Sequence, residues 1–267
     1  MYNGFGVNYK KRLQDELAEE MTTYINQKGL KDVIGLPLLG YAFADDKRFM
    51  TAYDADLTLH PKEIYRPGTT VIVSFLPYIP KYVQDNFIEN DDKTDVSKAW
   101  KFAYESSIIV SAHINTFTLD FLEGMGREAS LSNIHTDWNP DTHRPEWSHK
   151  IAAYIAGMGE FGPNGCIRTE YGPWGRFNSI LTEVQLEPTG KDTGDEANID
   201  NEVDIVEDYK TFSLFENPVS IPPQVISACP CDAISKEGID QVKCQDYCYK
   251  QNEFIPEPDA CGRCYTR

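Results

Sequence analysis

The chain has 267 residues, of which 41% are apolar and 25% are charged, and its formal net charge is −17. This length and composition are typical of a soluble globular protein with one large domain, or one domain plus a small appendage. The acidic charge disfavours nucleic acids and anionic membranes as partners, and no apolar run reaches the ~20 residues that span a bilayer. The N-terminus lacks the apolar segment of a secretory signal, so we expect a cytoplasmic protein.

The first third of the chain predicts one helix and two strands. Apolar residues recur at helical spacing over residues 8–28, and Gly29 is a natural end for that helix. Residues 35–44 alternate weakly and predict a strand. Residues 69–76 (TTVIVSFL) are β-branched and aromatic and lie between Pro-Gly and Pro. Because this run is apolar on both faces, it predicts a central strand that is covered on both sides.

The middle of the chain predicts a long helix, a short helix and another strand. An apolar stripe runs along residues 95–123, and Thr94 or Asp95 can cap its start. Residues 147–156 predict the short helix, and residues 178–186 predict the strand.

Two further segments predict loops. Residues 127–146 contain two prolines and are expected to be mostly loop. Residues 188–210 are strongly acidic, which favours a solvated surface loop. We place the domain boundary after this loop, with an α/β core over residues 1–210 and a Cys-rich tail over residues 211–267.

A passage rich in glycine follows the short helix. It contains six glycines in close succession, Gly157, Gly159, Gly162, Gly165, Gly172 and Gly175. Glycine lets the backbone turn tightly and approach a ligand closely. The spacing fits neither the dinucleotide fingerprint nor the phosphate loop. From the residues alone, a ligand-binding loop and a turn-rich connector remain equally open.

The same passage resembles a known superfamily. AGMGEFG, TEYG and ILTEVQL in succession, with RPGTTVIVSFLPY upstream, are similar to the core signature of reductive dehalogenases and epoxyqueuosine reductases. The resemblance implies an α/β (α+β), nitroreductase-like core that binds cobalamin without a covalent bond and with the lower base displaced from cobalt. By this resemblance, the residues expected to contact the corrinoid are Gly159, Gly162, Asn164, Thr169, Trp174 and Ser179.

Three side chains are candidates for acid–base chemistry at such a cofactor. The family places a tyrosine in its active site, and Tyr104 is the best match; the alternative is a buried core tyrosine. One branch of the family uses an aspartate before the short helix, and Asp141 lies in the corresponding region. His143 is a candidate proton shuttle, because histidine titrates near neutral pH. Structural or surface histidines remain the alternative.

The tail carries six of the seven cysteines. In a cytoplasmic protein, clustered thiols bind a metal more often than they form disulfides. "ACPCDAI" and "CGRC" resemble parts of two ferredoxin-like motifs, but the first motif lacks three ligands, since Val219, Pro222 and Val225 stand where cysteines belong. The resemblance therefore leaves at most one 4Fe–4S cluster, with ligands Cys229, Cys261 and Cys264 plus Cys244 or Cys248.

Two other interpretations of the tail remain open. One is a structural zinc site formed by two pairs of cysteines, Cys244 with Cys248 and Cys261 with Cys264. The other is a vestigial tail with disulfides or free thiols.

Two main functional hypotheses follow from these observations. The first is a cobalamin-dependent iron–sulfur reductase resembling reductive dehalogenases, which would draw electrons from a redox partner protein. The second is a corrinoid-binding, storage or trafficking protein without catalysis. A flavin protein on the same kind of fold is a third alternative. Acidic charge and the missing ligands both count against an RNA substrate.

Overall fold

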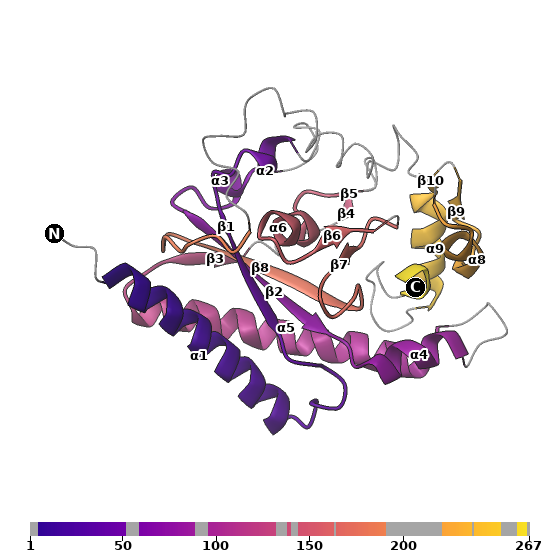
Figure 1. Cartoon of the computed structure of the whole chain (residues 1–267), viewed down its shortest axis with the longest axis horizontal. Helices are drawn as coiled ribbons and strands as arrows, with labels where there is room; N and C mark the ends of the chain where they lie inside the picture. Colours follow the sequence, from indigo (N-terminus) through magenta and orange to yellow (C-terminus); the bar gives the residue numbers. More distant parts are fainter. Residues whose placement is uncertain are drawn as a thin grey trace.

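The computed structural model describes residues 5–51, 59–88, 96–131, 138–139, 144–162, 164–190, 221–236, 238–251 and 261–265. Its centre is a four-stranded antiparallel sheet in the order β1-β2-β8-β3 (Figure 1). The strands are β1 (Leu38–Phe43), β2 (Thr70–Pro77), β3 (Ala129–Leu131) and β8 (Gly175–Thr182). All eight residues of β2 are buried, so the prediction of a central strand that is covered on both sides is confirmed.

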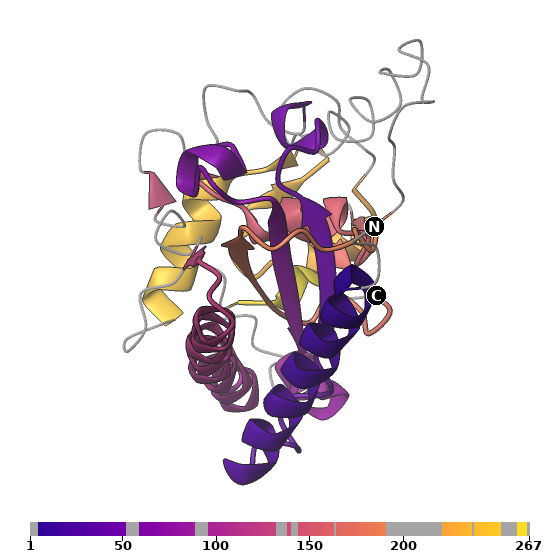
Figure 2. The ribbon, with the colours of Figure 1, turned by 90° about the vertical axis from the view of Figure 1, so that its left-hand side faces the viewer.

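Helices cover both faces of this sheet (Figures 1 and 2). Successive side chains of a strand point to opposite faces. Ile72 and Leu76 of β2 accordingly pack with α1 (Phe5–Gln27) and α5 (Lys98–Gly124). Val71 and Val73, in alternation, pack with α6 (His149–Ile155).

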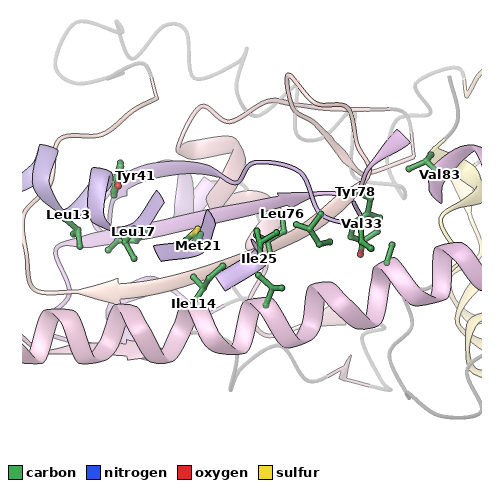
Figure 3. Close-up of a cluster of buried hydrophobic side chains, with 14 of the residues drawn as sticks. Leu13, Leu17, Met21, Ile25, Val33, Tyr41, Leu76, Tyr78, Val83 and Ile114 are labelled. Carbon is green, nitrogen blue, oxygen red and sulfur yellow. The ribbon is translucent and has the colours of Figure 1, made fainter. Parts of the chain in front are cut away.

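The larger of the two cores lies between α1, α5 and the sheet. One stripe of α1 supplies four buried residues, Leu13, Leu17, Met21 and Ile25. They meet Tyr41 of β1, Leu76 of β2 and Ile114 of α5 (Figure 3). The helical periodicity of residues 8–28 therefore marks the face that α1 buries.

The remaining elements are short and lie around this centre. In the first half of the chain they are α2 (Arg48–Thr51), α3 (Pro61–Ile64) and α4 (Pro80–Ile88). Two small ribbons follow, β4 (Trp138–Asn139) with β5 (Arg144–Pro145) and β6 (Glu160–Phe161) with β7 (Ile167–Arg168).

The tail contributes α8 (Pro223–Ala228), β9 (Ile234–Ser235), β10 (Gly238–Ile239), α9 (Gln241–Gln251) and η3 (Arg263–Tyr265). It has a small hydrophobic cluster of its own, centred on Val225 and Ile234. The proposed boundary at residue 210 lies outside the described residues and stays a prediction.

The structure confirms the α+β class and differs from the sequence in detail. Helix α5 starts at Lys98, and its cap is Ser97, whose Oγ accepts a hydrogen bond from the Trp100 amide at 3.1 Å. Thr94 and Asp95 lie outside the described residues. Strand β8 covers residues 175–182 rather than 178–186, because the apolar sequence continues past the last ladder pair at Thr182.

Two further points concern loops and membranes. The expected loop at 127–146 contains β3, whose three residues complete the sheet by pairing with β8. Within the described residues, none of the helices combines the length and apolar character needed to cross a bilayer.

Candidate functional site

Tyr104 lies in a buried polar cluster where β2 ends and β8 begins. It sits on α5 and is 4% exposed. The guanidinium carbon of Arg176 lies 4.5 Å from the centre of its ring. Arg176 comes from β8, opposite Leu76 of β2. A cation against the face of an aromatic ring is stabilising, and more so away from water.

Ser107 connects this pair to a second tyrosine. Its Oγ donates to the carbonyl oxygen of Tyr104 at 2.6 Å and accepts from Nε of Arg176 at 3.1 Å. The hydroxyl oxygen of Tyr78 lies 3.1 Å from the same Oγ. A serine hydroxyl has one proton and two lone pairs, so the Tyr78 hydroxyl is the donor. Sequence reasoning missed Ser107, although it lies three residues after Tyr104 and thus on the same face of the helix.

The glycine-rich passage packs mainly against itself. A Cβ at Gly159 would overlap the carbonyl oxygen of Arg168, so the ribbon of β6 and β7 needs glycine there. Oγ1 of Thr169 donates to the carbonyl of Gly172 at 2.8 Å and closes the following turn. A Cβ at Gly162 would lie 3.1 Å from Oδ1 of Asn164. The contact at Gly159 explains that glycine without a ligand, so glycine content alone does not indicate a corrinoid site.

The other predicted corrinoid contacts divide into two groups. Ser179 is 1% exposed and already has two partners, because its Oγ lies 3.0 Å from Nε1 of Trp147 and 2.8 Å from Nδ1 of His149. Asn164 faces the tail and donates to the carbonyl of Cys264 at 2.8 Å. Trp174 differs, since its indole Nε1 is buried and no hydrogen-bond acceptor in the described part of the chain reaches it.

Asp141 and His143 lie outside the described residues, so their roles stay predictions. A hollow of about 10 Å³ lies elsewhere, between α1, α5 and the sheet, and is lined by residues such as Leu17, Met21 and Asn178. This is roughly the space that one water molecule needs. It gives the corrinoid expectation no support.

The tail brings its cysteines together from three separate segments. The sulfur of Cys229, after α8, lies 3.7 Å from that of Cys231 and accepts from the Ala233 amide at 3.2 Å. A hydrogen bond with the Cys244 thiol, with burial as the next cause, raises the pKa of Cys248 on α9. None of the seven cysteines forms a disulfide.

The thiols are close enough to influence one another. Burial is the main cause that raises the pKa of Cys261 to about 12, and the thiols of Cys244 and Cys229 contribute to this rise. Burial also raises the pKa of Cys264, and Cys166, Cys261 and Cys244 add to this. Metal ligation reverses such shifts, because a bound cation stabilises the thiolate.

The positions of the tail's thiols fit a 4Fe–4S cluster better than a single zinc ion. A tetrahedral zinc ion needs four donors at ~2.3 Å from one point. Across the ranges that the structure describes, no three His, Cys, Asp or Glu side chains converge in that way. A 4Fe–4S cluster takes its thiolates at corners of a larger cube, so the spread of these thiols suits a cluster better. Cys231, beside Cys229, is a further candidate ligand that sequence reasoning left out.

The tail lies beside the end of the core where α4 is found and α5 begins (Figure 1). The ring of Trp100 on α5 fills the space where a Cβ of Gly262 would stand. The same ring lies 5.3 Å from that of Tyr78. The Trp100 side chain therefore lies between the Cys261–Cys264 turn and the Tyr104 cluster, to which Tyr78, Ser107 and Arg176 belong.

Comparisons with known proteins give the fold and little more. Neither protein-family profiles nor curated proteins match the sequence. Among solved structures, an epoxyqueuosine reductase with an epoxyqueuosine-modified tRNA-Tyr stem loop has a TM-score of 0.52 at 14% identity, with 96% of this chain and 64% of that chain covered. A selenomethionine-labelled epoxyqueuosine reductase (15% identity) and the Bacillus subtilis enzyme (14%) each have a TM-score of 0.50, with 95% and 64% covered.

These likenesses show that the chain shares a fold with epoxyqueuosine reductases. Epoxyqueuosine reductases are one of the two families that the sequence resembles. The chain spans about 64% of the length of these structures. One of them was solved with a tRNA stem loop, so the comparisons do not support the expectation that a nucleic-acid partner is disfavoured.

Proposed function

We propose that this chain is a cobalamin-dependent redox protein in which the tail holds one 4Fe–4S cluster beside a corrinoid-binding core. The observation that carries the proposal is the convergence of the tail's thiols next to the Tyr104 cluster, on the fold of epoxyqueuosine reductases. The cluster ligands are Cys229, Cys261 and Cys264, completed by Cys244 or Cys248. The nitroreductase-like classification and the division at residue 210 belong to this proposal.

The donor set fits a cluster. Thiolate sulfur is the usual ligand of iron–sulfur clusters. Cys229 and Cys248 are buried, at 5% and 1% exposure, and Cys244, Cys261 and Cys264 are partly buried. Such a cluster supplies single electrons. Val219, Pro222 and Val225 stand where ligands of a second cluster are expected, and we propose that a redox partner protein supplies the electrons.

Support for the corrinoid is narrower. The buried indole N–H of Trp174 has no acceptor among the described residues, and an unsatisfied buried donor costs about 1–3 kcal/mol. An acceptor on a bound ligand, such as an amide oxygen, would remove this cost. The described residues outline no corrinoid cavity of their own, so we derive no chemical step at cobalt.

Within this proposal, Tyr104 is the proton donor. A general acid must reach the reacting group, and its charge state must suit the step. Arg176 lies against the Tyr104 ring and favours negative charge on the phenol oxygen. Asp141 and His143 remain candidates for a second acid or base. The type of substrate, whether a small organohalide or a modified RNA base, stays open.

The second candidate is a corrinoid-binding, storage or trafficking protein without turnover. The missing ligands Val219, Pro222 and Val225 favour it, because a reductase with one cluster depends on an external electron donor. In this case the tail would stabilise the fold without carrying electrons.

One set of measurements tests the proposal. The full chain is reconstituted anaerobically with ferrous iron and sulfide, its iron is counted, and it is titrated with cobalamin. We expect about four iron atoms per chain and a corrinoid affinity tighter than about 1 mM, or −4 kcal/mol. Cys264→Ala should lose the iron, whereas Cys166→Ser, outside the proposed ligand set, should retain it.

The outcomes separate the alternatives. Corrinoid binding without iron would favour the storage protein. Iron without corrinoid binding would leave an iron–sulfur protein and overturn the cobalamin assignment. Loss of both would overturn the proposal as a whole.

A further inference from the structure

The turn that carries Cys261 and Cys264 is held by the core of the protein. Asn86 of α4 is 0% exposed, and its Nδ2 donates to the carbonyl oxygen of Cys261 at 2.8 Å. Its Oδ1 accepts from the Ser97 amide at 3.0 Å, at the start of α5. Both ends of the Asn86 amide are therefore used, and they fix the turn to the junction of two core helices.

A second asparagine makes the same contact at the other cysteine. Nδ2 of Asn164, in the glycine-rich passage, donates to the carbonyl oxygen of Cys264 at 2.8 Å and lies 3.9 Å from its sulfur. Oδ1 of Asn164 accepts from the Cys166 amide at 3.3 Å. The side-chain amide of Asn164 is thus held by the core through its oxygen, and its nitrogen points toward the tail.

The backbone between the two cysteines is positioned by a third contact. Gly262 has φ +64°, and the Trp100 ring occupies the place of a Cβ. The Cys261–Tyr265 segment has only the short helix η3 as regular structure. Three core residues from different elements, Asn86, Trp100 and Asn164, therefore determine where the two thiols stand.

We propose that Asn86 and Asn164 are positioning residues of the iron–sulfur site, so that the core, through these two amides, sets the placement of Cys261 and Cys264 as iron ligands. This inference rests on the proposed function, because it requires that the tail binds a cluster. It also reassigns Asn164, which the sequence placed against the corrinoid.

The two asparagines should affect both how firmly the chain retains the cluster and the redox potential of the cluster. Hydrogen bonds near the sulfurs are one of the factors that set the potential of a cluster. A donor beside Cys264 stabilises the extra negative charge of the reduced state. Removing it should lower the midpoint potential. Removing a carbonyl contact should also loosen the turn, and a hydrogen bond worth about 1.4 kcal/mol corresponds to a tenfold change.

The test compares Asn164→Leu with the wild-type chain, both reconstituted with iron and sulfide and without corrinoid. We expect iron release to a chelator to be about tenfold faster in the variant and its cluster potential to be more negative in an EPR-monitored titration. Asn86→Leu should act in the same direction. Because Asn86 is fully buried, that variant could fail to fold, and the partly exposed Asn164 then decides the test.

Asn26→Leu is the matched control, since Asn26 is exposed on α1 far from the tail. Its release rate and potential should equal those of the wild type. If Asn164→Leu behaves like this control while the wild type holds its cluster, the inference is overturned and the proposed function stands. A wild-type chain that takes up no iron would overturn both.

Discussion

In the Tyr104 cluster, one polar side chain stabilises the core through two contacts. Arg176 contributes a cation against a buried ring and a hydrogen bond to Ser107. A cation–π contact is worth about 0.5–2 kcal/mol, and a net hydrogen bond about 1 kcal/mol. We expect Arg176→Met to lower the free energy of unfolding by about 1–3 kcal/mol, as measured by urea denaturation of the metal-free chain.

Arg127→Met is the matched change at the surface. Arg127 is 56% exposed and lies 3.6 Å from Glu183, and an exposed ion pair is worth at most about 1 kcal/mol. Equal losses in the two variants would mean that Arg176 stabilises the protein no more than a surface arginine does.

The sequence proposed Tyr104 as a site residue, which stays a prediction, and did not name its surroundings. The resemblance placed a tyrosine on the long helix, and the helical period could have pointed to Ser107 on the same face. Arg176 lies in β8 and Tyr78 directly follows β2, and the two come together only through the register that pairs Leu76 with Arg176. No local pattern contains that register, because it depends on how β2 and β8 pair across roughly a hundred residues.

At the scale of elements, the contact between Gly262, just before η3, and Trp100 of α5 leaves no room for one methyl group. A Cβ at Gly262 would overlap the Trp100 ring, and φ is +64°. Left-handed strain alone costs about 1–2 kcal/mol, and the overlap adds to it. We therefore expect Gly262→Ala to release the tail from α5, measured as faster limited proteolysis between residues 221 and 265.

Gly29→Ala is a close control for this prediction. Gly29 ends α1 with φ +69°, and a Cβ there would meet no heavy atom within 4 Å. It carries the same backbone strain without the steric overlap, so the tail's cleavage rate should stay at the wild-type value. If Gly262→Ala leaves that rate unchanged as well, the contact with Trp100 does not hold the tail.

The elements themselves were largely predictable, and their ends were not. Residues 8–28, 35–44, 69–76 and 95–123 each became the expected helix or strand, because a long apolar period reports which face is buried. The start of α5 depends on which polar residue finds a free amide, and Ser97 does so because Asn86 orders its backbone. Strand β3 has only three residues, which is too short for an alternating apolar pattern to be recognised in the sequence.

At the scale of the whole molecule, the core and the tail differ in how much apolar surface holds them. The sheet packs against α1 and α5 on one face and α6 on the other through two extensive clusters. The tail's own cluster has five buried residues, Ile221, Val225, Cys229, Ala233 and Ile234. Small apolar cores rarely suffice alone and often need a metal, so iron should contribute much of the tail's stability.

Removing the iron should therefore unfold the tail before the core. Because binding to the folded state adds directly to stability, anaerobic chelation should raise amide hydrogen exchange in α8 and α9 while β2 and β8 keep their protection. Cys264→Ala, prepared without iron, provides the metal-free reference for the tail. If the tail exchanges equally slowly with and without iron, its fold does not depend on a cluster. If β2 loses protection together with the tail, core and tail form one cooperative unit, and the boundary near residue 210 has no thermodynamic meaning.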